Sequence, residues 1–332
     1  MALAAASYQP SMGIFQATYR PGGAGAVTIV VAQEKADDPT AKIIIYVGLG
    51  YTTTLGQAPG TTIGSVVAHV EPLDLTTNSV PLTGPLKTDN PASYVSNLCA
   101  PGLHEAVWVL NAALPGQPAN PIPVYVDHTA GAEAALGSAK LQICFAPPDV
   151  PMGTPGRAPK GAKFLDAAFT ISGVFKNRAT AGEELWRSLF TPFTPKTGAP
   201  DAAATTEAQG IVPMPYSISA RRRPARSGFF RLAGKLNLAG AAPGGISLTL
   251  YAGVKKKSGL AFSPVSVTNT RRHGLYAFTR RLPAKTTYFF VERGPTSRAC
   301  ATPTIVASCT TAITSNAISA VIKIAPAKRR HR

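Results

Sequence analysis

The sequence predicts an all-β protein made of two antiparallel β-sandwich units, or three if the middle of the chain folds separately. Short β-branched and aromatic runs recur along the chain and are bounded by Gly, Pro, Asn or Asp, as is typical of strands joined by turns. Thirty glycines and thirty prolines among 332 residues interrupt the windows that have helical spacing. Because no helix-length segment separates successive strands, the strands are expected to pair antiparallel.

Six runs in the first 150 residues have strand character and predict an N-terminal sandwich. They are Ala26–Gln33, Lys42–Val47, Ser65–Val70, Glu105–Leu110, Ile122–Asp127 and Lys140–Phe145. A segment with five prolines, Pro147 to Lys160, follows them and predicts an extended linker or a long surface loop, which we take as the first boundary. The next runs, Phe164–Phe175, Leu185–Phe193 and Thr205–Ala220, fit either a small middle domain or strands that complete the first sandwich.

The last third of the chain predicts a second sandwich. Its strand-like runs are Phe229–Leu238, Ile246–Tyr251, Val265–Asn269, Leu275–Arg280, Thr287–Val291 and Ala317–Ile324. In the fourth run Tyr276 and Phe278 alternate with Leu275, Ala277 and Thr279, so one aromatic face is expected to be buried. The turn residues Pro243-Gly244-Gly245 and Arg272-His273-Gly274 separate neighbouring strands.

Gly274-Leu-Tyr-Ala-Phe278 followed by Lys285-Thr-Thr-Tyr288 resembles a pattern of immunoglobulin-like or transthyretin-like sandwich repeats. Such repeats occur in secreted and cell-surface proteins of bacteria, and the Ala, Pro, Gly and Thr bias of the chain is similar to exported proteins of high-GC actinobacteria. The resemblance covers about 100 residues. It implies a fold and an exported location, and it brings no catalytic residues with it.

These patterns give six predicted parts. Residues 1–12 are a signal-peptide remnant and N-terminal arm, because Ala4-Ala5-Ala6 resembles the end of a signal peptide. Residues 13–148 form the first sandwich, 149–162 the Pro-rich linker or loop, and 163–218 the middle β segment. Residues 219–326 form the second, immunoglobulin-like sandwich, and 327–332 are a basic tail.

Charge is distributed very unevenly along the chain. The net charge is +17, but residues 1–150 hold 5 Lys/Arg against 10 Asp/Glu, whereas residues 219–332 hold 21 basic residues and one acid, Glu292. Such a field attracts polyanions. The candidate polyanion-binding residues are those of the basic clusters: Arg221, Arg222, Arg223, Arg226, Lys255, Lys256, Lys257, Arg271, Arg272, Arg280 and Arg281. The alternative is a solubilising surface with its charges spread evenly.

Four cysteines predict two disulfides and an oxidising compartment. Neither a CxxC spacing nor a nearby histidine suggests zinc, and no metal or cofactor is expected. Cys99 with Cys144 and Cys300 with Cys309 would keep each bridge within one domain, although four cysteines allow three connectivities. No segment approaches the roughly 18 apolar residues that a membrane span requires, so no transmembrane segment is expected.

The remaining candidates for a catalytic or binding role give weaker signals. His104-Glu105 and Asp127-His128 are acid–histidine neighbours, but adjacent strand residues face opposite ways, so a site would require His104–Asp127 or Glu105–His128 to meet across strands. We expect ordinary strand-end histidines instead. Gly48-Leu-Gly50 predicts a turn because no helix follows it. Trp108 and Trp186 are expected in the core, not on a sugar-binding platform.

The preferred functional hypothesis is a non-enzymatic exported protein of the cell envelope or extracellular space. Its basic second module would contact an anionic cell-wall polymer or acidic polysaccharide. One alternative is a secreted hydrolase with its site in residues 1–218, using acids such as Glu105 and Asp127. Nucleic-acid binding ranks last, because no recognition motif accompanies the charge.

Overall fold

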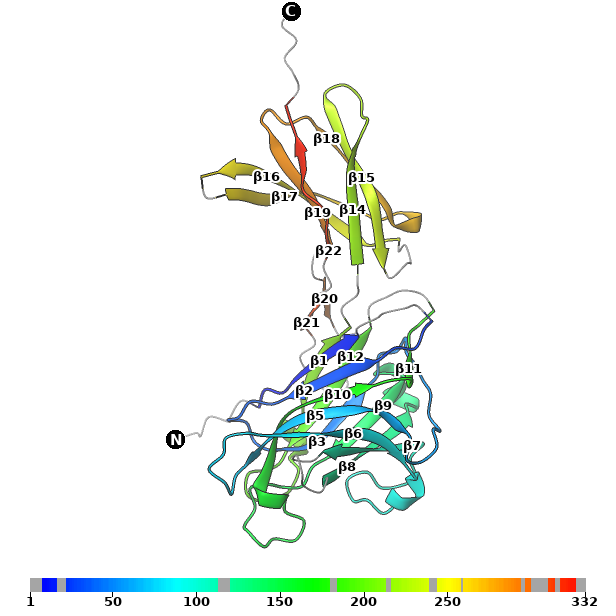
Figure 1. Cartoon of the computed structure of the whole chain (residues 1–332), viewed down its shortest axis with the longest axis vertical. Helices are drawn as coiled ribbons and strands as arrows, with labels where there is room; N and C mark the ends of the chain where they lie inside the picture. Colours follow the sequence, from blue (N-terminus) through cyan, green and yellow to red (C-terminus); the bar gives the residue numbers. More distant parts are fainter. Residues whose placement is uncertain are drawn as a thin grey trace, which may run out of the picture.

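The computed structural model describes residues 8–16, 22–112, 120–179, 184–212, 216–238, 244–257, 259–293, 296–299, 310–313 and 317–326. Across these residues the regular structure is β strand apart from short 3-10 turns, and the strand pairings are antiparallel. The predicted all-β fold class is therefore confirmed. Figure 1 shows two bodies stacked along the long axis of the molecule.

The first body is built on one eleven-stranded sheet in the order β1-β2-β10-β5-β6-β7-β8-β9-β3-β12-β13. Its strands β5 to β9 form a continuous meander. The bounds are β1 Ser11–Gln16, β2 Val27–Ala32, β3 Thr40–Tyr46, β5 Thr62–Pro72, β6 Val80–Asp89, β7 Ala106–Ala112, β8 Asn120–His128, β9 Ala139–Cys144, β10 Ala162–Ile171, β12 Leu185–Pro192 and β13 Thr206–Ile211. A small pair, β4 Thr52–Thr53 with β11 Phe175–Lys176, accompanies the sheet.

This sheet rolls up until its two end strands, β1 and β13, contact each other. Glycine at Gly210 of β13 permits the approach, because a Cβ there would lie 2.9 Å from the Ile14 side chain of β1. Inward-facing residues of all eleven strands then share one hydrophobic cluster, in which Trp108 and Trp186 are fully buried. We call residues 8–212 the rolled-sheet unit. Its two facing layers belong to a single sheet.

The middle of the chain does not form a separate sheet. Strand β10 pairs with β2 and β5, and β12 pairs with β3 and β13, so these strands complete the rolled sheet. The proline-rich segment that we took as a first boundary is instead a loop between β9 and β10. Val150 and Ala158 of this loop are buried, and the Arg157 guanidinium makes two 2.7 Å hydrogen bonds to the Asp74 carboxylate. Local composition allowed either an extended linker or a long surface loop, and these contacts show the loop.

The second body, residues 216–326, is a sandwich of two sheets, which we call the sandwich unit. One sheet has the order β14-β15-β18 and the other β17-β16-β19, with β22 and β23 both beside β19. The bounds are β14 Tyr216–Arg223, β15 Phe229–Leu238, β16 Ser247–Lys256, β17 Gly259–Asn269, β18 Leu275–Arg281, β19 Thr287–Arg293, β22 Ala317–Ile318 and β23 Ile322–Ile324. If β14, β15, β16, β17, β18 and β19 are lettered A, B, C, C′, E and F, and β22 with β23 is lettered G, the sheets have the orders A-B-E and C′-C-F-G. This is the immunoglobulin-like arrangement that the sequence predicts.

Residues of both sheets meet in one core in the sandwich unit. Phe230, Leu232 and Phe278 come from the first sheet, and Leu250 and Val291 from the second. The aromatic face predicted for the β18 run is confirmed, since Tyr276 and Phe278 are each 3% exposed.

Tyr216 and Arg293 lie where the two units meet. At the start of β14 the Tyr216 ring packs against both cores, and the Arg293 guanidinium lies 4.2 Å from the centre of that ring. A further two-stranded pair, β20 Thr296–Ala299 with β21 Thr310–Ile313, lies between the bodies in Figure 1.

Candidate functional site

The outer surface of the sheet β14-β15-β18 carries three of the predicted site residues, Arg221, Arg223 and Arg281. Along β15 the side chains of Phe230, Leu232, Leu236 and Leu238 are buried, so the residues between them point away from the core. The antiparallel register extends this alternation to both neighbouring strands. One side of the sheet is therefore apolar and the other faces solvent.

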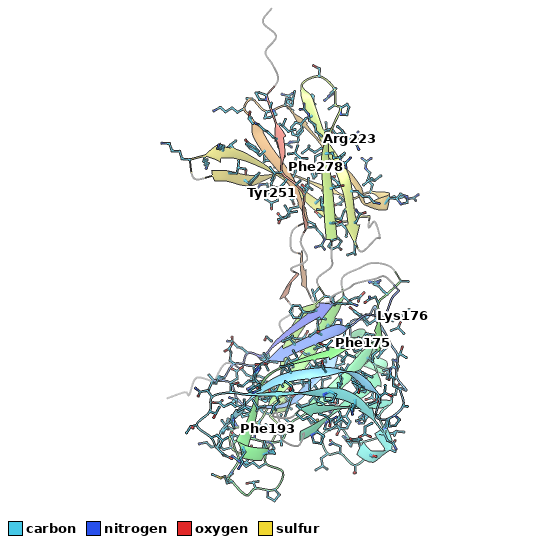
Figure 2. The ribbon with its side chains drawn as sticks, in the orientation of Figure 1. Phe175, Lys176, Phe193, Arg223, Tyr251 and Phe278 are labelled. Carbon is cyan, nitrogen blue, oxygen red and sulfur yellow. A yellow bond between two sulfur atoms is a disulfide. The ribbon has the colours of Figure 1, made fainter. Side chains whose placement is uncertain are left out.

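Five basic side chains occupy this outer surface, which we call the basic face: Arg221, Arg223, Arg231, Lys235 and Arg281. The four arginines are exposed and Lys235 is half-buried. Arg223 stands directly opposite Arg231, and Arg281 directly opposite Phe229. Figure 2 shows Arg223 on β14 in the upper body.

One further arginine borders the basic face. Arg226, in the turn between β14 and β15, places its guanidinium 4.1 Å from the centre of the Phe229 ring. This stacking holds a sixth cation at the same end of the sheet as Arg223 and Arg281.

No carboxylate neutralises these charges within the described part of the chain. Glu292, the single acid of residues 219–332, lies on β19 in the opposite sheet. There it accepts a hydrogen bond from the Tyr251 hydroxyl, which raises the pKa of Tyr251. Like charges placed directly across two strands destabilise a sheet, so the Arg223–Arg231 pair has a cost that no described residue offsets.

The other predicted basic residues lie elsewhere. Arg222 and Arg280 are exposed and lie next to the last residues of β14 and β18. The strand alternation directs both side chains toward the core side of the sheet. Lys255, Lys256 and Lys257 lie at the end of the β16–β17 hairpin, in the other sheet. Arg271 and Arg272 precede β18, at its end remote from Arg281. The structure thus gathers some of the predicted residues and disperses the rest.

Sequence reasoning missed Arg231 and Lys235, two of the five residues of the basic face. Each is an isolated charge in an apolar run, so neither belongs to a cluster of adjacent charges in the sequence. The alternation of Phe229–Leu238 carries the missing signal, since Phe230 and Leu232 point inward and the residue between them must point outward.

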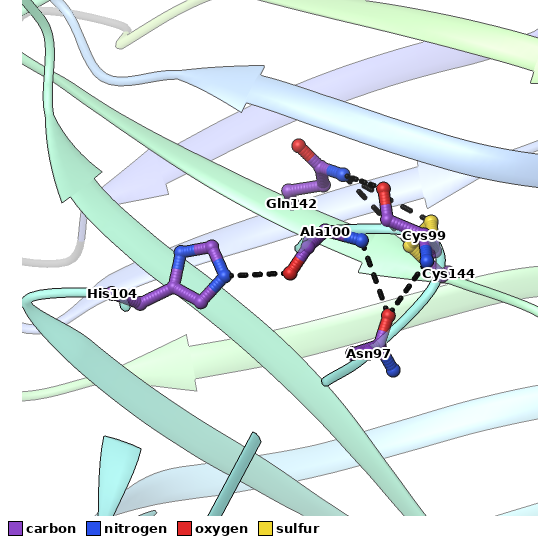
Figure 3. The surroundings of a disulfide bond; sticks show 6 residues. All are labelled: Asn97, Cys99, Ala100, His104, Gln142 and Cys144. Carbon is purple, nitrogen blue, oxygen red and sulfur yellow. Dashed lines mark hydrogen bonds between the residues drawn. A yellow bond between two sulfur atoms is a disulfide. The ribbon is translucent and has the colours of Figure 1, made fainter. Parts of the chain in front are cut away.

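The disulfide between Cys99 and Cys144 is present and lies in the rolled-sheet unit (Figure 3). The Asn97 side-chain oxygen accepts hydrogen bonds from the backbone amides of Cys99 and Ala100, and the Gln142 side-chain amide donates to the Cys99 carbonyl at 2.9 Å. The bridge ties the loop after β6 to the end of β9. The predicted Cys300–Cys309 bridge falls outside the described residues.

His104 and His128 lie at strand ends as expected, but both also meet an acid across the strands, which was not expected. The register of β7 and β8 places Ala106 opposite Val126, so the residues beyond the ladder also face each other. The His104 Nδ1 lies 3.0 Å from an Asp127 carboxylate oxygen, and the His128 Nδ1 lies 2.6 Å from a Glu105 carboxylate oxygen. Both cross-strand pairs therefore form.

Backbone contacts show that these pairs close the end of the β7–β8 hairpin. The Glu105 amide donates to Asp127, the His128 amide donates to Glu105, and the second ring nitrogen of His104 lies 2.9 Å from the Ala100 carbonyl oxygen (Figure 3). A third pair, His69 with Asp166 at 2.8 Å, joins β5 to β10 in the same way.

In the exposed His128–Glu105 pair, each side chain shifts the pKa of the other. The hydrogen bond to Glu105 raises the pKa of His128. Partial burial acts to raise the pKa of Glu105, but hydrogen bonds from the His128 ring and backbone outweigh it and the net shift is downward. Each shift favours the charged form of its group, as expected for a pair that holds two strand ends together.

The remaining candidates are structural. Gly48-Leu-Gly50 forms the predicted turn, with the Tyr51 amide donating to the Gly48 carbonyl, and the Gly50 amide donates to the Glu184 carboxylate at 2.9 Å. The Glu184 carboxylate therefore already accepts the hydrogen bond that the Gly50 amide would have to donate to a bound anion. Both tryptophans are in the core as predicted. Among the described residues no three His, Cys, Asp or Glu side chains gather as a metal site would require.

Comparison with known proteins gives no family for this chain. No family model matches the sequence, and no curated protein matches it significantly. Among solved structures, the full-length major pilin SpaD of Corynebacterium diphtheriae aligns at 11% identity over 93% of this chain, with a TM-score of 0.27. This chain spans 61% of that pilin.

Two further structures align with similarly low sequence identity and TM-score. A two-domain fragment of the same pilin gives 10% identity over 92% of this chain and 89% of the fragment, with a TM-score of 0.25. A set of titin domains gives 10% identity over 96% of this chain and 99% of the titin fragment, with a TM-score of 0.21. Scores of this size do not establish a shared topology. Within the described residues, no helix has the length and apolar character needed to cross a membrane.

Proposed function

We propose that this chain is a non-enzymatic exported protein whose basic face binds an anionic polymer of the cell envelope. The observation that carries the proposal is the direct opposition of Arg223 and Arg231 on an outer sheet surface where no described residue places a carboxylate. A polyanion laid on this surface would supply the missing negative charge. Relief of the repulsion between Arg223 and Arg231 would then contribute favourably to the free energy of binding.

The geometry of a sheet suits a repeating polymer. Successive outward residues along a strand lie about 7 Å apart, and neighbouring strands lie about 4.8 Å apart. Cations on the basic face therefore form a flat grid with a spacing comparable to that of charges along a polymer. Guanidinium groups also bind phosphate and carboxylate oxygens in pairs, and four of the five residues are arginine.

Export is supported by the Cys99–Cys144 disulfide, because such bridges persist in oxidising compartments. The available polyanions there are teichoic-type phosphate polymers and acidic polysaccharides. These are the partners that we propose.

The hydrolase alternative has less support from the described residues. Its candidate acids, Glu105 and Asp127, are each held by a histidine and by backbone amides at a hairpin end. The apolar cavity inside the rolled-sheet unit has neither acid among its lining residues.

Binding of the full chain to a glycerol-phosphate teichoic polymer and to hyaluronate tests the proposal, with dextran as an uncharged control. We expect retention by both anionic polymers at 50 mM salt and a loss of tenfold or more in affinity by about 200 mM, because binding releases counterions. No retention at low salt, or equal retention by dextran, would contradict the proposal. Tighter binding to DNA of similar charge density would favour the nucleic-acid alternative.

A further inference from the structure

The rolled sheet encloses a cavity of about 260 Å³. Side chains from β2, β3 and β5 to β10 line it, so it extends across the interior between the two layers of the sheet. The lining contains Ala, Val, Leu, Ile, Phe and Pro side chains and the disulfide-bonded Cys144, without a titratable group. The cavity is independent of the basic face, which belongs to the sandwich unit.

The cavity lies where strands β8 and β9 separate. Pairing between these strands begins at Val124 and Ile143, so the first residues of β8 pair with β7 alone. Pro121 and Pro123 stand in this stretch and have no amide hydrogen to donate to a ladder. Both prolines line the cavity, as do the residues that follow β9.

Apolar side chains that are only half-buried also border the cavity. Val70, Leu82, Ile122 and Phe145 line it and remain partly exposed to solvent. The Phe145 ring lies 5.0 Å from that of Phe164, which also lines the cavity. The interior is thus reached past apolar groups, and a polar ligand would lose its hydration without finding a hydrogen-bond partner among the lining side chains.

We propose that this cavity binds a single linear alkyl chain. An apolar cavity of about 150 Å³ stays free of water and takes up benzene, and the present cavity is considerably larger. If a methylene group needs about the 30 Å³ that a water molecule takes in the liquid, roughly eight or nine carbons fit inside. Any polar headgroup stays outside, since the interior offers it no partner.

Linear primary alcohols from hexanol to dodecanol test this proposal, because they are uncharged and do not engage the basic face. Calorimetric titration of the full chain should show one site. Affinity should rise about fourfold for each added methylene and level off near nine carbons. Absence of binding across the series, or a rise that continues through dodecanol, would overturn the proposal.

Two substitutions on neighbouring residues of β5 give a matched test. Ala68 lines the cavity, whereas Val67 is 46% exposed on the opposite face of the same strand. Ala68→Phe should lower decanol affinity at least tenfold, and Val67→Phe should leave it unchanged. If Ala68→Phe does not fold, Ala167→Leu on β10 fills the same cavity with a smaller change in volume.

An empty packing gap is the competing explanation. In that case the filling variants raise the unfolding midpoint, and the parent chain binds no alcohol, which overturns the proposal. Decyl phosphocholine carries the same tail on a lipid headgroup. Binding equal to that of decanol supports the site with lipid tails as a source, and weaker binding supports it for free alkyl compounds.

Discussion

The two units of this protein differ in whether their cationic side chains pair with carboxylates. In the rolled-sheet unit Lys, Arg and His side chains pair with carboxylates, and the eight described pairs all lie between Lys35 and Glu207. The sandwich unit has no such pair among its described residues, although it carries most of the positive charge. In one unit charge holds strands together, whereas in the other the cations of the basic face have no carboxylate beside them among the described residues. Removing a charge should therefore have opposite consequences in the two units.

The largest effect should come from the disulfide, which stabilises the rolled-sheet unit alone. Cys99 and Cys144 are 45 residues apart, and a loop of that length corresponds to about 4 kcal/mol in the chain-entropy treatment. Replacing both cysteines with serine should lower the free energy of unfolding by about that amount. Denaturant unfolding followed by tryptophan fluorescence reports on this unit, because both tryptophans are in its core. An unchanged transition would contradict the assignment.

Breaking a buried ion pair of the rolled-sheet unit should have the next largest effect. The Arg187 and Glu207 side chains are 8% and 5% exposed and lie 3.1 Å apart on neighbouring strands. Glu207→Ala leaves the guanidinium buried without this carboxylate, and we expect a loss of about 3 kcal/mol. The same denaturation assay measures it. A loss below 1 kcal/mol would show that charge pairing contributes little to this unit.

A smaller, pH-dependent effect should come from the exposed His128–Glu105 pair. The pKa of His128 is raised, so its contribution is complete below the ordinary value of 6.5 and is lost as pH rises through the folded value. The pKa of Glu105 is lowered, so its contribution is complete above the ordinary value of 4.5 and is lost as pH falls through the folded value.

The difference in unfolding free energy between the parent chain and His128→Gln should therefore be greatest between about pH 4.5 and 6.5. Solvent screening limits it to less than about 1 kcal/mol. A difference that is constant from pH 4 to 8 would mean that the pair acts through packing and not through charge.

The smallest effect should have the opposite sign. Arg231→Thr removes the like-charge opposition with Arg223 and introduces a good strand former. The sandwich unit should gain a few tenths of a kcal/mol at low salt, and the gain should vanish at about 0.5 M salt. Thermal unfolding at the two salt concentrations measures it. A loss of stability at low salt would indicate that Arg231 has a structural role.

Strand positions follow from sequence wherever alternation is clean. Phe229–Leu238 is observed with the predicted bounds, and Leu275–Arg280 extends by one residue. Strand β6, Val80–Asp89, was not predicted, because Pro81, Gly84 and Pro85 hide its alternation. Local pattern also could not show that the proline-rich loop packs on the sheet, since that depends on contacts distant in sequence.

The functional residues divide in the same way. Lys and Arg density identified the sandwich unit, but which cations share a face depends on strand register, which is set by the hydrophobic alternation of the strands and by turn geometry, not by the density of charge. For the same reason the His104–Asp127 and His128–Glu105 pairs were not expected. The cavity has no sequence signal, because its lining residues are those of any hydrophobic core.

Two variants with equal net charge test the central claim most directly. One combines Arg221→Thr, Arg223→Thr and Arg231→Thr on the basic face, and the other combines Lys255→Thr, Lys256→Thr and Lys257→Thr at the β16–β17 hairpin. Binding of both to the teichoic polymer is measured against salt concentration. The account predicts that the first variant loses at least tenfold in affinity at 50 mM salt, with a salt slope lower by about three, while the second loses less than threefold. Equal losses in the two variants would show that net charge, and not the basic face, determines binding.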